Sequence, residues 1–91
     1  MALMLCRNKV RDYVVWKQLF DSHAAAHRDA GLTLLHLWRS LEDPNDVFFL
    51  FGVADVERAR AFVIDPDNLR AGDTAGVLEG EMYFLEDAPS P

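Results

Sequence analysis

The amino-acid sequence predicts an α+β domain in which four strands are interleaved with two helices. Three observations support this. Apolar residues recur with a helical period in residues 12–31 and 56–63, four other stretches are short and rich in branched or aromatic side chains, and turn-forming residues separate the segments. The 91 residues, 51% of them hydrophobic, are enough for a single core. We therefore expect one domain over residues 1–87 and a frayed tail over residues 88–91.

The first predicted strand and helix occupy residues 2–9 and 12–31. The apolar run of residues 2–9 is too short for a stable amphipathic helix. Asp12 is a suitable N-cap for the helix, and Gly31 is a suitable residue to end it. One stripe of this helix, roughly 120° wide, carries large apolar side chains and two histidines. Its members are Tyr13, Trp16, Leu19, Phe20, His23 and His27.

The remaining elements follow from turn and cap residues. Residues 32–41 and 47–53 form a predicted hairpin, because Pro44 and Asn45 lie in the turn-forming segment between them. Asp55 caps a helix over residues 56–63, and Pro66 starts a short helical turn to about Arg70. Residues 81–86 form the last strand. The order β-α-β-β-α-β is the ferredoxin-like arrangement, with two helices on one face of a four-stranded antiparallel sheet.

The predicted strands are apolar on both faces, although the helices of one chain cover only one face. An uncovered apolar sheet of this kind indicates self-association. We therefore expect a homodimer in which two sheets face each other as an α+β barrel with the helices outside.

Composition excludes several other partners. The formal charge is −6 and no basic cluster occurs, so neither nucleic acid nor an anionic membrane surface is an expected partner. No segment approaches the roughly 20 apolar residues of a membrane span. The one cysteine, Cys6, has no partner for an internal disulfide. A cytoplasmic location is the expectation.

The sequence also resembles a group of small bacterial proteins in the dimeric α+β barrel superfamily, which are akin to the antibiotic biosynthesis monooxygenases and are loosely called cyclases. The matching segments are Asp12-Tyr13, Trp16-Lys17, Phe20-Asp21-Ser22-His23, Gly31, Arg39-Ser40, Asp43-Pro44-Asn45-Asp46-Val47, Ala59-Arg60-Ala61-Phe62, Ala75-Gly76-Val77 and Tyr83-Phe84-Leu85-Glu86. The resemblance covers almost the whole chain. It implies the barrel fold, a dimer and, for some members, cofactor-free oxygenation of small aromatic or polyketide-like molecules.

Haem-degrading members of that superfamily ligate iron through a histidine on the second helix. Residues 56–63 contain no histidine, so haem is not expected here. A metal is an alternative use of His23 and His27, whose i,i+4 spacing lets two imidazoles share an ion, with His36 as a third ligand. No glutamate lies between them as in the H-E-x-x-H pattern, so our expectation is no metal and no bound cofactor.

The candidate catalytic residues are His23 and His36, each able to act as a general base. Strand alternation places His36 and Trp38 on one face with Leu32 and Leu34. If that face meets the first helix, both residues can share a cavity with His23; if it meets a second chain, His36 is structural. The candidate substrate-binding residues are Tyr13, Trp16, Phe20, His27 and Trp38.

Two interpretations of function remain open. In the first, the protein is a monooxygenase- or cyclase-like enzyme with an aromatic-lined cavity beside His23. In the second, it is a non-catalytic homodimer that binds a small molecule or only assembles, and its histidines lie at the core edge. A closed pocket of a few hundred Å³ between helix and sheet favours the first.

Overall fold

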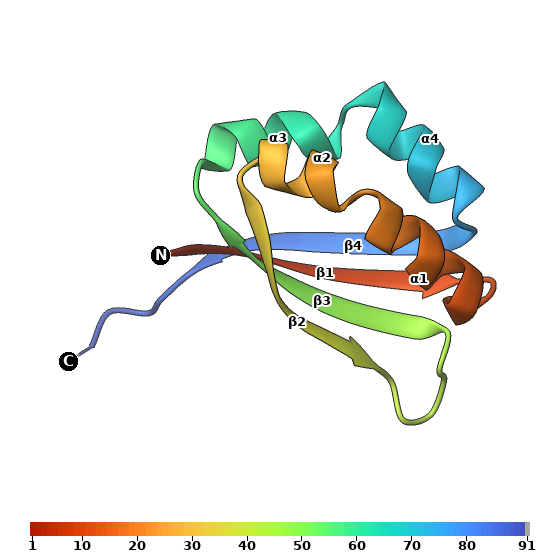
Figure 1. The fold of residues 1–91 in the computed structure, drawn as a ribbon. Coiled ribbons are helices and arrows are strands. Elements are labelled where there is room, and N and C mark those ends of the chain that lie inside the picture. Colours follow the sequence, from red (N-terminus) through yellow and green to blue (C-terminus); the bar gives the residue numbers. More distant parts are fainter. Residues whose placement is uncertain (91) are drawn as a thin grey trace.

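The computed structural model describes residues 1–90 as four strands and four helices. The elements in chain order are β1 (Ala2–Val10), α1 (Tyr13–Ser22), α2 (Ala24–Asp29), β2 (Leu32–Arg39), β3 (Asp46–Val53), α3 (Val56–Val63), α4 (Pro66–Thr74) and β4 (Val77–Glu86). The strands form one antiparallel sheet in the order β2-β3-β1-β4. All four helices lie over the same face of that sheet (Figure 1). The predicted ferredoxin-like α+β fold is therefore confirmed.

The core lies between the helices and the sheet. Alternate residues of β1 and β3 point toward the helices and are buried, as the period of a strand requires. On the helix side, Trp16 is 2% exposed and Ala59 is fully buried. The core residues contributed by the two central strands are Met4, Cys6, Val10, Val47, Phe49, Phe51 and Val53.

The predicted single helix over residues 12–31 is instead two helices that meet at His23. The N-cap is as predicted, since the Asp12 carboxylate accepts hydrogen bonds from the amides of Val14 and Val15. At the break, the side chains of Ser22 and His23 both bond to the carbonyl oxygen of Leu19, at 2.6 and 2.7 Å. These side chains compete for an acceptor that an uninterrupted helix would use for its own backbone. The break places His23 at a corner between α1 and α2.

The C-terminal elements are longer than predicted. The helical turn expected to end near Arg70 continues as α4 to Thr74, and the strand expected at residue 81 begins at Val77. Gly76, which has a φ of 82°, follows the end of α4. The strand β4 is longer than predicted because it pairs with β1 from Ala2 to Val10, which is the whole length of β1.

A β-bulge in β2 corrects the predicted assignment of its faces. The register with β3 shifts between Leu34 and His36, so that Leu35 is an extra residue. Because one inserted residue reverses the alternation, His36 and Trp38 do not share a face with Leu34. They lie opposite Leu50 and Phe48, on the face away from the helices.

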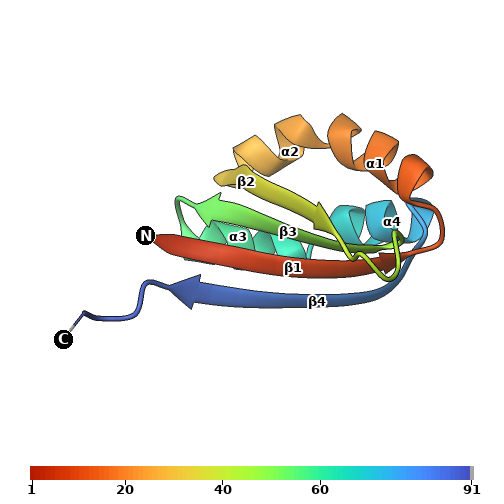
Figure 2. The same cartoon turned by 90° about the horizontal axis from the view of Figure 1, so that it is seen from below.

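The uncovered face of the sheet is apolar over much of its area. Figure 2 views the molecule from this side, with β1 and β3 at the centre of the sheet. Its apolar residues are Leu3, Leu5, Leu35, Trp38, Phe48, Leu50, Tyr83 and Leu85. At one end of this face Arg7 forms ion pairs with Asp46 at 2.7 Å and with Glu81 at 3.1 Å.

No helix within residues 1–90 is long and apolar enough to span a membrane. The tail predicted to fray has no regular structure over residues 87–90, and Pro91 lies outside the described residues.

Candidate functional site

A cavity of about 420 Å³, partly open to solvent rather than closed, lies between the helices and the covered face of the sheet. Its floor comes from β1, β3 and β4, and its walls come from α1 and α2 on one side and α3 and α4 on the other. The lining is mostly apolar, and its aromatic or sulfur-containing members, apart from two histidines, are Met4, Cys6, Trp16, Phe20, Phe49, Phe51, Phe62 and Met82. Both His23 and His27 also line the cavity. Its size and lining suit a small, flat, apolar molecule.

His23 is held in one tautomer. Its Nδ1 atom lies 2.7 Å from the carbonyl oxygen of Leu19, and a carbonyl oxygen can only accept a hydrogen bond. In the neutral imidazole, Nδ1 therefore carries the proton and donates it to Leu19, which leaves Nε2 with a free lone pair. Ser22 Oγ, 3.3 Å from Nδ1, also donates to the same carbonyl oxygen and fixes the corner. A histidine in this state can accept a proton at Nε2.

His27 lies among three phenylalanine rings. Its ring centroid is 5.0 Å from that of Phe20, 5.2 Å from Phe51 and 5.8 Å from Phe62. Burial lowers the pKa of His27, and the nearby His23 lowers it further. His27 is therefore uncharged at neutral pH and serves as part of the aromatic wall.

The lowered pKa of His27 predicts a pH-dependent stability. As pH falls, the unfolded chain takes up a proton at His27 before the folded chain does. The free energy of unfolding should therefore decrease from about pH 6.5, the ordinary histidine pKa, and level off below the lowered pKa. Replacement by His27→Phe should flatten this part of the profile. Urea unfolding of both proteins between about pH 7.5 and 4.5 measures the difference; parallel profiles would contradict the prediction.

Cys6 forms part of the cavity floor. Burial raises the pKa of its thiol to about 12. The thiol therefore stays protonated at neutral pH and behaves as a small apolar group.

Four of the seven candidate residues line the cavity, namely Trp16, Phe20, His23 and His27. Tyr13 lies outside it and packs against Trp16, with ring centroids 6.0 Å apart.

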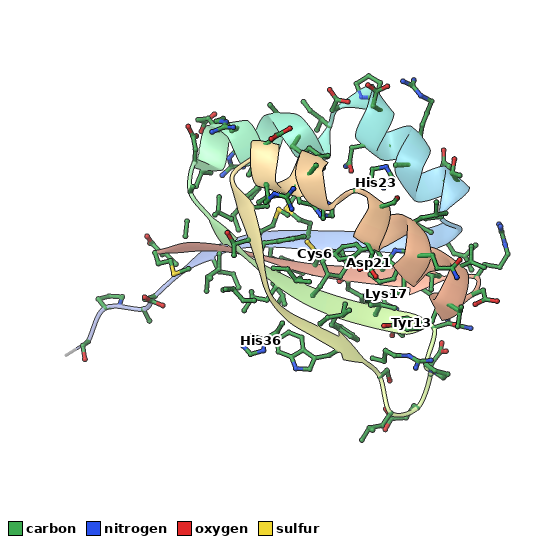
Figure 3. All side chains as sticks on the ribbon, in the orientation of Figure 1. Cys6, Tyr13, Lys17, Asp21, His23 and His36 are labelled. Carbon is green, nitrogen blue, oxygen red and sulfur yellow. The ribbon has the colours of Figure 1, made fainter. Side chains whose placement is uncertain are left out.

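His36 and Trp38 stack on each other with centroids 5.0 Å apart, and they lie on the opposite face of the sheet. Figure 3 shows His36 on the side of β2 away from the helices. The interpretation that both residues share a cavity with His23 is therefore wrong, because the bulge at Leu35 turns them outward.

Solved structures of other proteins have the same arrangement of strands and helices. SnoaB, a cofactor-independent oxygenase from Streptomyces nogalater, matches with a TM-score of 0.76 and 15% identity over 98% of this chain and 94% of that chain. A protein described as an antibiotic biosynthesis monooxygenase matches with a TM-score of 0.70 and 14% identity over 98% of this chain and all of that one. This chain has the antibiotic biosynthesis monooxygenase fold.

The same fold also occurs in an uncharacterised NIPSNAP domain protein from Burkholderia xenovorans, at a TM-score of 0.67 and 14% identity over 97% of this chain and 95% of that chain. No family model and no curated protein matches the sequence. Identities of 14–15% establish the shared fold and leave the reaction to be argued from this chain's own residues.

Within the antibiotic biosynthesis monooxygenase fold of this chain, several lining residues were not among the sequence candidates. Asn8 extends from β1 on the same face as Met4 and Cys6, and Asn68 and Asp73 come from α4. The signal for Asn8 was present, because it continues the alternation of the buried positions in β1. The α4 residues had no such signal, since the sequence predicted only a short helical turn there.

The three histidines do not gather in this fold. His23 and His27 lie on the helix side of the sheet, and His36 lies on the other side. Among the residues that the structure describes, no group of three His, Cys, Asp or Glu side chains is placed to hold a metal ion.

Proposed function

We propose that this protein binds a small, flat, mainly apolar aromatic molecule in the 420 Å³ cavity and that His23 removes a proton from it without a bound cofactor. The observation that carries this proposal is an aromatic-lined cavity with a histidine, His23, whose Nδ1 proton is hydrogen-bonded to the carbonyl oxygen of Leu19. Trp16 and Phe20 would hold the ligand by stacking, and the uncharged His27 would extend that wall.

The chemistry needs only a base and a ligand with an acidic C–H. Loss of that proton to His23 Nε2 gives an electron-rich enolate or phenolate. Such a carbanion can react with dioxygen so that a CH₂ group becomes a carbonyl and the second oxygen atom leaves as water. The oxygenation step is supported by the shared fold with SnoaB, which is a cofactor-independent oxygenase.

The proposal includes a homodimer formed through the uncovered face of the sheet. Trp38 is 46% exposed and Leu85 is 43% exposed on this face in the single chain. Contiguous exposed apolar surface of this kind marks an interface between proteins. A second copy would cover it and close the two sheets into a barrel.

Ligand binding tests the proposal. We expect 2-naphthol to bind the wild-type protein and to shift the NMR signals of Trp16, Phe20 and His23, which line the cavity. Ala71 lines the cavity from α4 and is half-buried, so Ala71→Phe should fill part of the space and weaken binding at least about tenfold.

The control is Ala25→Phe, which adds the same ring at an exposed site on α2 outside the cavity. This variant should bind as the wild type does. No binding to the wild type, or equal loss in both variants, would contradict the proposed site.

A further inference from the structure

Asn8 is the one amide in the cavity that the fold leaves without a partner. Across residues 1–90 its carboxamide makes no hydrogen bond with another residue. The other amide, that of Asn68, donates to the carbonyl oxygen of Val63 at 3.3 Å and thereby ties α4 to α3. Since a half-buried carboxamide carries two donors and an acceptor, Asn8 is available to a ligand.

The residue opposite Asn8 keeps this carboxamide uncovered. Gly80 pairs with Asn8 across β1 and β4, and a Cβ atom at this position would lie 3.5 Å from Asn8 Oδ1. The backbone does not require glycine there, because the glycines with positive φ are Gly31 and Gly76. Glycine in the interior of a strand weakens the strand and often marks a place where a ligand approaches closely. Gly80 also lines the cavity.

The charges around the cavity decide which ligand group Asn8 can recognise. No lysine or arginine lines the cavity, whereas Asp73 and Glu81 do. The nearby Arg7 is held by Asp46 and Glu81 on the other face of the sheet. A carboxylate on the ligand would lose its hydration without gaining a cation, while a neutral hydroxyl or carbonyl can exchange hydrogen bonds with the amide.

We infer that Asn8 is a specificity-determining residue that binds a neutral hydroxyl or carbonyl oxygen at one end of the aromatic ligand, while the other end lies at His23. This inference rests on the proposed function, because it requires an aromatic molecule in the cavity. The substrate class is then a flat aromatic with two uncharged oxygen functions at its opposite ends, and aromatic carboxylates are poor ligands.

Three related probes test the inference by calorimetry. We expect 2,6-dihydroxynaphthalene to bind the wild-type protein about fivefold more tightly than 2-naphthol, since one neutral hydrogen bond is added. The related 6-hydroxy-2-naphthoate should bind at least about fivefold more weakly than the diol. The side-chain NH₂ signals of Asn8 should shift with the diol and not with 2-naphthol.

Two variants locate the effect. Asn8→Leu should bind both naphthols equally and keep the wild-type affinity for 2-naphthol within about twofold. Gly80→Val covers the Asn8 carboxamide without removing it, and it should also abolish the tighter binding of the diol relative to 2-naphthol. This second variant keeps the inference testable if Asn8→Leu does not fold. His23→Gln should still bind the diol more tightly than 2-naphthol.

A second hydroxyl that still improves binding in the folded Asn8 or Gly80 variant would overturn the assignment of Asn8. It would leave the proposed function intact. If neither naphthol binds the wild-type protein, the proposed function fails and the inference fails with it.

Discussion

Replacing Leu50 with glutamate should abolish the proposed dimer and leave a folded monomer. Leu50 lies on β3 near the centre of the uncovered face, opposite Leu5 of β1 and His36 of β2. In a two-fold dimer the substitution would bury two carboxylates without partners, and each would cost several kcal/mol. Since every 1.4 kcal/mol is about a tenfold change in affinity, dimerisation should weaken by more than about 1,000-fold.

The chain itself should tolerate the change, because the neighbouring core residues Phe49 and Phe51 point to the other side of the sheet. Val14→Glu is the matched control, since Val14 is 63% exposed on α1 and outside the sheet. Sedimentation equilibrium measures the dissociation constant, and circular dichroism checks the fold. A monomeric wild-type protein, or a Leu50→Glu protein that dimerises with wild-type affinity, would refute the proposed interface.

The sequence predicted the fold because strong local signals agreed with it. Asp12 and Asp55 cap helices where expected, and Val56–Val63 is a helix with the expected bounds. The helical period also selected five residues of the cavity wall, because a 3.6-residue repeat determines which side chains of α1 and α2 face inward. This periodicity survives the break at His23.

The parts that could not be predicted depend on contacts between distant segments. The bulge at Leu35 reverses the faces of His36 and Trp38, and it is visible only in the pairing of β2 with β3. The sequence ended this helical turn near Arg70, whereas α4 continues to Thr74 and is followed by Gly76, which has a positive φ. Asn8 became a candidate only when its partner across the sheet, Gly80, was known.

Replacing His23 with glutamine should remove the general base of the proposed site. The hydrogen bond from Nδ1 to Leu19 leaves Nε2 as the basic atom of the site. Glutamine retains a hydrogen-bonding side chain of similar reach but is not a base at neutral pH. Since a positioned general base contributes about 10²- to 10⁴-fold to a proton transfer, His23→Gln should slow proton removal at least about 100-fold. Binding of 2-naphthol should change much less than this rate.

Deuterium uptake at the acidic CH₂ group of 2-tetralone in D₂O measures proton removal by His23. The probe is a bicyclic aromatic ketone, its exchange needs no dioxygen, and NMR follows the loss of the proton signal. We expect wild-type protein to accelerate exchange over buffer alone and His23→Gln to lose at least about 100-fold of that acceleration. Exchange no faster than in buffer, or equal in both proteins, would contradict His23 as the base and leave a binding domain without this activity.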